Sequence, residues 1–146
     1  NEHNDEHFWS SSLSSALHRT WVGIAFERVC MQHIPQIKKA LGIDGVLTNV
    51  YSRQTKATDD YPGAQIDVLL DRQDGIVNIC EAKFSSTPYC MSQEDENNLN
   101  RRQSVFVHHT KTTKAVHPIL LTTYSPIENV YLRSVQKVIT MEELFT

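Results

Sequence analysis

Residues 66–84 read IDVLLDRQDGIVNICEAKF, which is two apolar runs joined by a polar turn. The runs 66–70 and 76–84 have the length and the apolar, β-branched content of strands, and Asp74-Gly75 between them is typical of a tight hairpin. Three charged residues interrupt these apolar runs: Asp67, Glu81 and Lys83. Charged side chains inside apolar strands are costly unless they are paired or bind a metal, so this hairpin is the first candidate for a functional site.

The length of the turn decides which face of the hairpin Asp67 occupies. A two-residue turn would pair Asp67 with Ala82, whose side chain lies on the face opposite to Glu81. A three-residue turn over 73–75 would pair Asp67 with Glu81, and Gly75 would take the left-handed conformation that such a turn requires. Opposed carboxylates have Cβ atoms about 4.5–5.5 Å apart, which suits one shared divalent cation and is repulsive without it. We therefore predict the three-residue turn, provided that no bulge interrupts the hairpin.

The rest of the chain predicts one α/β domain. The predicted helices span 13–41, with a break near Ile34 where Pro35 opens a second short helix, 92–109 with a Ser92–Asp95 cap, and 141–145. The further predicted strands are 46–51, 117–124, 130–132 and 138–139, with a polar loop over 53–63. A hairpin followed by a helical crossover implies a mixed sheet flanked by helices, in the order αβββαβ.

Length, charge and cysteine usage limit the possible classes of protein. The 146 residues fit one domain over 13–146, preceded by a polar segment over 1–12 that we expect to be a flexible lead-in or linker. The net charge of −3 disfavours a protein that coats duplex DNA through overall basicity. No apolar run is long enough to span a membrane. The three cysteines lack the spacing of a disulfide framework or a metal site, which favours a cytoplasmic location.

Oxygen ligands in the hairpin predict the chemistry of a hard metal ion. Two carboxylates select Mg²⁺ or Mn²⁺ over Zn²⁺, and such an ion stabilises charge on a phosphate and lowers the pKa of a bound water. Lys83 beside the ion would orient that water or offset transition-state charge. Glu27, in the first helix, is the candidate for a further carboxylate ligand. The alternative is a structural ion pair in which Lys83 neutralises Asp67 and Glu81.

For two further features the sequence allows either a functional or an ordinary structural role. Between residues 99 and 117 the sequence has four cations and no acid: Arg101, Arg102, Lys111 and Lys114. This segment either contacts phosphates or is a solvated helix end and loop. Gln103 either faces the site from the helix or is a helix-surface amide.

The spacing Asp67–x13–Glu81–x–Lys83 and the element order resemble the PD-(D/E)xK nuclease superfamily, which has the restriction-endonuclease-like fold. The resemblance implies that Asp67 and Glu81 are the metal ligands, that Lys83 is the catalytic lysine and that Glu27 is the helix acid. The sequence has Ile66 where the short form of this signature has Pro.

Three short sequence segments extend the resemblance beyond the Asp–Glu–Lys spacing, to about residues 15–146. They are WVGIAFE at 21–27, QIDV at 65–68 and ITMEELF at 139–145, and they resemble the C-terminal domain of a class of prokaryotic P-loop (AAA-type) ATPases. The chain has no GxxxxGK[ST] of its own, so we expect it to be the C-terminal fragment of such an ATPase.

The expected activity is Mg²⁺-dependent hydrolysis of phosphodiester bonds, in DNA, by the effector domain of an ATPase. In this hypothesis Asp67 and Glu81 hold the metal with help from the Ala82 carbonyl. The alternative hypothesis is a catalytically inactive nuclease-like domain that docks the ATPase to nucleic acid or to another protein.

Overall fold

The computed structural model describes the backbone of residues 2–146 and the side chains of residues 14–146. The elements are α1 (Glu2–Gln32), α2 (Ile34–Ala40), β1 (Thr48–Thr55), β2 (Ala64–Arg72), β3 (Ile76–Lys83), α3 (Gln93–Thr110), β4 (Ala115–Thr122), the 3₁₀ helix η1 (Val130–Ser134), β5 (Lys137–Thr140) and α4 (Met141–Leu144). Helices therefore precede three strands, and α3 is inserted before the fourth strand. This α/β arrangement confirms the predicted αβββαβ order.

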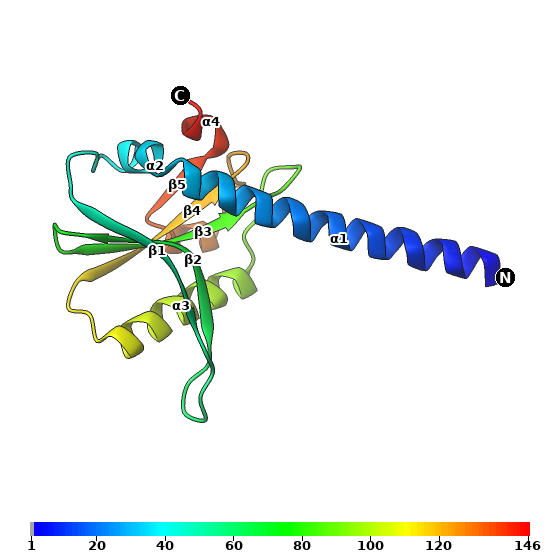
Figure 1. The fold of residues 1–146 in the computed structure, drawn as a ribbon, viewed down its shortest axis with the longest axis horizontal. Coiled ribbons are helices and arrows are strands. Elements are labelled where there is room, and N and C mark those ends of the chain that lie inside the picture. Colours follow the sequence, from blue (N-terminus) through cyan, green and yellow to red (C-terminus); the bar gives the residue numbers. More distant parts are fainter. Residues whose placement is uncertain (1) are drawn as a thin grey trace.

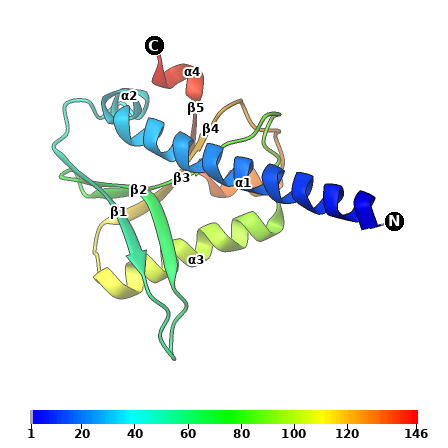
Figure 2. The same ribbon diagram turned by 45° about the vertical axis from the view of Figure 1, so that its right-hand side comes forward.

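The five strands form one mixed sheet in the order β1-β2-β3-β4-β5. The pairs β1–β2 and β2–β3 are antiparallel, whereas β3–β4 and β4–β5 are parallel. Parallel neighbours need a long crossover, and α3 provides it between β3 and β4. Figures 1 and 2 show α1, α2 and α4 on one side of the sheet and α3 on the other, with the first part of α1 extending beyond the sheet.

The two faces of the sheet bury two separate apolar clusters. The face beneath α1, α2 and α4 buries Phe26, Cys30, Ile37, Ile43, Val68, Leu70, Cys80, Ile119, Leu121, Ile139 and Leu144. The face beneath α3 buries Ile66, Leu69, Val77, Ile79 and Phe106. Neighbouring strand residues such as Ile79 and Cys80 therefore serve different clusters, as strand alternation requires.

The helix ends follow the local sequence signals. The α1 helix ends at Gln32, and Pro35 lies in the first turn of α2, as predicted from the clash that a proline causes inside a helix. Gly42 follows α2 with a φ of +72°, a conformation that favours glycine. The predicted cap of α3 is confirmed, because Ser92 Oγ accepts from the Asp95 N–H and the Asp95 carboxylate accepts from the Ser92 N–H.

Two boundary predictions were wrong. The loop predicted over 53–63 begins later, because β1 continues to Thr55 by pairing with the start of β2. The strand predicted over 130–132 is part of the 3₁₀ helix η1, because Asn129 Oδ1 accepts from the Tyr131 and Leu132 N–H groups and caps it.

A third prediction concerns the N-terminal segment. The backbone is already helical from Glu2, within the segment for which a lead-in is predicted. The side chains of residues 1–13 and all of residue 1 lie outside the described part of the chain, so the flexible lead-in over 1–12 stays a prediction.

The turn between β2 and β3 has the predicted three residues. Asp71 pairs with Val77, β2 ends at Arg72 and β3 begins at Ile76, so the turn consists of 73–75. Gly75 has a φ of +86°, the left-handed conformation expected for it. This confirms the three-residue turn, although the observed pairing of the two strands ends at Val68 and Cys80, one position before Asp67 and Glu81.

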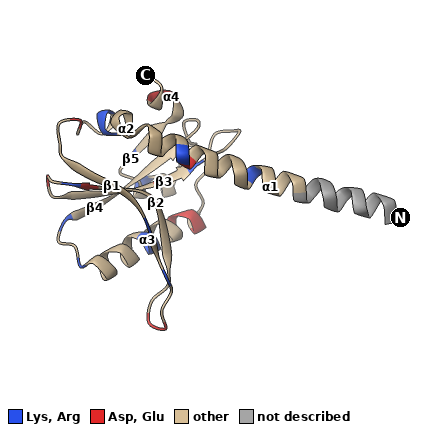
Figure 3. Cartoon of the chain, viewed as in Figure 1, with Lys and Arg blue, Asp and Glu red and all other residues tan. Residues whose placement is uncertain are grey.

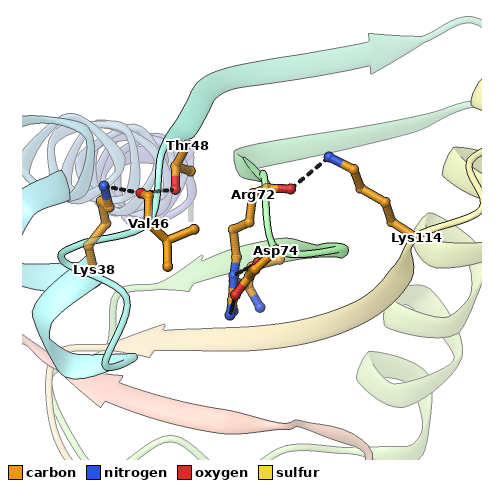
Figure 4. Close-up of polar contacts among 7 residues, drawn as sticks. Lys38, Val46, Thr48, Arg72, Asp74 and Lys114 are labelled. Atoms are coloured by element: carbon orange, nitrogen blue, oxygen red, sulfur yellow. Dashed lines mark hydrogen bonds and ion pairs between the residues drawn. The ribbon is translucent and has the colours of Figure 1, made fainter.

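Polar contacts hold the turn end of this hairpin (Figure 4). The Arg72 guanidinium donates two hydrogen bonds to the Asp74 carboxylate, at 2.9 and 2.6 Å, and a third to the buried Asn78 Oδ1 at 3.0 Å. Lys114 Nζ donates to the Arg72 carbonyl and to Asp71, both at 2.7 Å. In the same view, Lys38 Nζ donates to the Val46 carbonyl at 2.7 Å. These contacts hold the end of the hairpin that is remote from Asp67 and Glu81.

Candidate active site

The candidate site lies where β2 separates from β3. The described pairs of this hairpin end at Val68 and Cys80, although β2 continues to pair with β1 as far as Ala64. At the next position, Asp67 Oδ2 accepts a hydrogen bond from the Ala82 N–H at 3.2 Å. The Asp67 carboxylate thus replaces a strand carbonyl as the acceptor for β3. The two acids are neighbours across this separation and not a regular ladder pair.

A bulge in β2 sets the direction of Asp67. The register of β1 with β2 passes from the pair Tyr51–Leu69 to the pair Arg53–Ile66. Asp67 and Val68 together therefore face the single residue Ser52. As a result, Val68 packs beneath α1 while Ile66 packs beneath α3, although regular alternation would put both on one face. The bulge re-aims Asp67, an effect that bulges often have near active sites.

Glu81 and Lys83 lie on the α3 side of the sheet, and Ala82 faces the α1 side, as predicted from alternation. Lys83 Nζ lies 3.5 Å from Glu81 Oε1. Arg102 Nη1, from α3, lies 3.3 Å from Glu81 Oε2. The Glu81 side chain is only 9% exposed, so its charge depends on these two cations.

Sequence reasoning treated Arg102 only as part of a basic segment and missed its contact with Glu81. A signal was present, because Leu99, Arg102 and Phe106 follow one another at spacings of three and four residues, and the outer two are buried. The amide of Gln103 instead donates to the Val116 carbonyl at 3.4 Å. Gln103 therefore contacts β4 and not the carboxylates.

Burial destabilises the charges of the three predicted acids. Burial raises the pKa of Asp67 even though the Ala82 N–H and the charges of Arg102 and Lys83 lower it. Burial and the charge of Asp67 raise the pKa of Glu81 against the same two cations. Burial and the charge of Asp67 also raise the pKa of Glu27. Three carboxylates thus have only two cations among them, which favours an additional positive charge at this place.

The three acids border two different hollows. Glu27 and Asp67 line an open hollow of about 340 Å³ between α1 and the strands β1 and β2. Glu81 and Lys83 line a small pocket of about 20 Å³ under α3, together with Arg102. Asp67 is near both other acids, whereas Glu27 and Glu81 lie on opposite sides of it.

Two carboxylates are the type of donor that a hard divalent cation prefers. Across the described side chains, no group of three or more His, Cys, Asp or Glu is arranged to hold a metal. Mg²⁺ is commonly held by only one or two protein carboxylates, with water and substrate phosphate as the other ligands. Asp67 and Glu81 meet that requirement with oxygen donors alone. The predicted role of Glu27 as a ligand of the same ion stays a prediction.

A tyrosine that the sequence did not single out lines the same cavity. Burial and a hydrogen bond to Asp95 raise the pKa of Tyr89 far above its ordinary value. The phenol is therefore neutral and acts as a donor. For Asp95 burial alone would raise the pKa, but hydrogen bonds from Tyr89 and Ser92 lower it below its ordinary value. Asp95 thus adds a fixed negative charge beside Lys83.

The basic segment is partly used within the domain. Arg102 pairs with Glu81, and Lys114 pairs with Asp71 at 2.7 Å, whereas Arg101 and Lys111 are exposed. Figure 3 shows Lys and Arg distributed over several elements and a cluster of acids at the start of α3. A phosphate-binding role for this segment stays a prediction. In the part of the chain that the structure describes, no helix has the length and apolar content needed to cross a membrane.

Stability should depend on pH through Asp67. A raised pKa means that the folded chain binds the Asp67 proton more tightly than the unfolded chain. Protonated Asp67 therefore contributes its full stability below the ordinary pKa of 3.8. This contribution is lost as the pH rises through the raised pKa of the folded chain. Asp67→Asn removes the titrating charge and keeps an acceptor for the Ala82 N–H. We expect this variant to be more stable than the wild type near pH 7, and the difference to shrink as the pH falls to about 3.

Urea unfolding at a series of pH values measures this difference. A difference that stays constant with pH, or a variant that is less stable at neutral pH, would contradict the assignment of a buried, destabilised charge to Asp67.

Comparison with known proteins supports the fold class. No family model and no curated protein matches the chain. A solved structure described as "Protein of Unknown Function AF1548" is similar, with a TM-score of 0.51 and 18% sequence identity over 80% of this chain. The chain spans 64% of the length of AF1548. At this identity the likeness supports the shared α/β architecture alone.

Proposed function

We propose that this chain is a nuclease-like domain of PD-(D/E)xK type that hydrolyses phosphodiester bonds in DNA with Mg²⁺ or Mn²⁺. The observation that carries the proposal is that the Asp67 carboxylate accepts from the Ala82 N–H, on the residue of β3 between Glu81 and Lys83. The buried Glu81 and the half-buried Asp67 both have raised pKa values, and the Lys83 amine lies 3.5 Å from Glu81. Two hard oxygen donors beside a partly exposed lysine match the needs of metal-assisted phosphate chemistry.

Each residue of the site has a role in this proposal. The Asp67 and Glu81 carboxylates and the Ala82 carbonyl hold the metal, and Glu27 extends the acidic surface beside Asp67. When bound, the metal supplies charge stabilisation for the phosphate and a more acidic water. The Lys83 side chain is 34% exposed, so its ammonium can meet a water or a phosphate oxygen from solvent.

The proposed setting follows from the sequence resemblance. The domain would act as the effector of a P-loop ATPase that belongs to the same parent chain, with DNA as the nucleic acid. The exposed Arg101 and Lys111 support a phosphate contact beside α3. Three free cysteines, of which Cys30 and Cys80 are buried, support a reducing, cytoplasmic location.

Metal binding tests the proposal directly. We expect titration calorimetry to show Mn²⁺ binding to the wild-type chain, and Mn²⁺ to raise its unfolding temperature, because a ligand of the folded state stabilises it. Glu81→Ala removes one of two carboxylates and should abolish both effects. Glu128→Ala, which changes an exposed acid in a loop, is the matched control and should bind Mn²⁺ like the wild type. A wild-type chain that is indifferent to Mn²⁺ and Mg²⁺ would contradict the proposal.

The second candidate function is a catalytically inactive domain that docks the ATPase to nucleic acid or to another protein. Two observations favour it. Both oxygens of Glu81 already have cationic partners, as in a structural ion pair. In addition, α1 exposes a row of apolar side chains in which Leu17, Trp21 and Ile24 are 62%, 66% and 47% exposed. Absence of metal binding, together with loss of partner binding in Trp21→Ala, would support this function.

A further inference from the structure

Arg102 enters the candidate site from α3. Its side chain is 19% exposed and lines the cavity that also contains Glu81, Lys83 and Tyr89. Neither the predicted metal ligands nor the predicted catalytic lysine include it. Its position against Glu81 gives it a direct influence on any cation that binds there.

Two different contacts hold the guanidinium. Nε donates to the Gln65 carbonyl at 3.0 Å, and this carbonyl belongs to the strand that carries Asp67. Nη1 lies 3.3 Å from Glu81 Oε2. The guanidinium is therefore anchored to the backbone of β2 by one nitrogen, while another meets the carboxylate on β3.

The contact with Glu81 is the more easily exchanged of the two. The Nε contact with the Gln65 carbonyl is a hydrogen bond at 3.0 Å, whereas the Nη1 contact with Glu81 is a longer ion pair at 3.3 Å. Ion pairs without a good hydrogen bond are readily replaced by a stronger cation. The Nε–Gln65 bond does not involve Glu81, so it can persist when the Nη1 contact is given up.

Arg102 and a divalent cation compete for one carboxylate. Lys83 contacts Glu81 Oε1 and Arg102 contacts Oε2, so both oxygens have cationic partners. A divalent cation on Glu81 would be repelled by both of these cations, so its binding favours loss of at least one of the two contacts.

We propose that Arg102 is an exchangeable counter-ion: it neutralises Glu81 in the metal-free site and, when a divalent cation takes over Glu81, turns its free guanidinium nitrogens to a phosphate of the nucleic acid. This inference rests on the proposed metal site. It gives the site a form of control, because Glu81 stays neutralised until the metal arrives. Planar guanidinium groups bind phosphate oxygens well, so the displaced nitrogens find a suitable partner in the substrate.

The first test is a Mn²⁺ titration of Arg102→Gln by calorimetry. Loss of the competing cation should tighten Mn²⁺ binding about tenfold, equivalent to about 1.4 kcal/mol. Arg101→Gln is the matched control, because it removes the neighbouring exposed arginine of the same helix, and its Mn²⁺ affinity should equal that of the wild type. Circular dichroism and thermal unfolding establish that each variant is folded.

The second test measures binding of a duplex oligonucleotide with phosphorothioate linkages, which resist hydrolysis, in saturating Mn²⁺. Arg102→Gln should bind this duplex about tenfold more weakly than the wild type, the equivalent of one lost charge-assisted contact. Tighter metal binding together with weaker duplex binding is the signature of the exchange. A merely structural role for Arg102 would weaken both.

The two tests separate failure of this inference from failure of the proposed function. If the wild type binds no Mn²⁺, the metal site itself is refuted. If the wild type binds Mn²⁺ and a folded Arg102→Gln binds it equally or more weakly, the metal site stands and the counter-ion role is overturned. Unchanged duplex binding in Arg102→Gln would overturn the phosphate contact.

Discussion

Lys83→Met should reduce Mg²⁺-dependent DNA cleavage by at least about 10²–10³-fold, the usual effect of losing one charge that stabilises a transition state. Methionine keeps the apolar stem of the lysine and removes only the ammonium that lies 3.5 Å from Glu81. Asp67→Asn should have an effect at least as large, because it removes one of two carboxylates and keeps the acceptor for the Ala82 N–H. Initial rates on a plasmid substrate with and without Mg²⁺ measure both effects.

The control for this prediction lies on the same strand. Asp71→Asn removes an acid of β2 that pairs with Lys114 at the turn end of the hairpin, and it should leave cleavage unchanged. Since Asp67→Asn is also expected to stabilise the fold at neutral pH, its loss of activity cannot be ascribed to unfolding. Cleavage that persists in both Lys83→Met and Asp67→Asn would remove these residues from the mechanism.

Phe106→Ala should lower the free energy of unfolding by about 3–5 kcal/mol, the usual loss when a buried aromatic side chain is truncated. Phe106 is 3% exposed and holds α3 on the sheet through the cluster that contains Leu69 and Ile79. The Arg53 guanidinium also lies over its ring, 5.9 Å from the centroid, and that contact would be lost. Chemical unfolding with urea measures the change.

The neighbouring residue supplies the control for Phe106. Val107 is 40% exposed, so Val107→Ala should change the free energy of unfolding by less than about 0.5 kcal/mol. Equal losses in the two variants would contradict the packing of α3 through this face. Because α3 also carries Arg102, Phe106→Ala should loosen the contact with Glu81 as well.

The hairpin shows how much local sequence can predict. Alternation assigned Glu81 and Ala82 to opposite faces, and the expected pairing of the Asp67 and Glu81 carboxylates favoured a three-residue turn with Gly75 in the left-handed conformation. Both predictions are confirmed, because period-two alternation and the left-handed conformation of a glycine are local properties of the backbone. The helix break at Pro35 was predictable for the same reason.

Two other features depend on partners that are distant in sequence. The bulge at Asp67 arises because two residues of β2 face Ser52 of β1, and no local signal in β2 specifies that register. The contact of Arg102 with Glu81 requires α3 to pack across β3 after its crossover, and helical spacing alone indicates only which face of α3 is buried.

The sequence by itself determined the order of the elements, the turn between β2 and β3, and the residue types able to hold a hard cation, because these follow from local backbone preferences and side-chain chemistry. Only the tertiary structure decided where the Asp67 carboxylate points and which cations meet Glu81. Those choices depend on strand separation, a bulge and the packing of α3, where chain segments far apart in sequence come into contact.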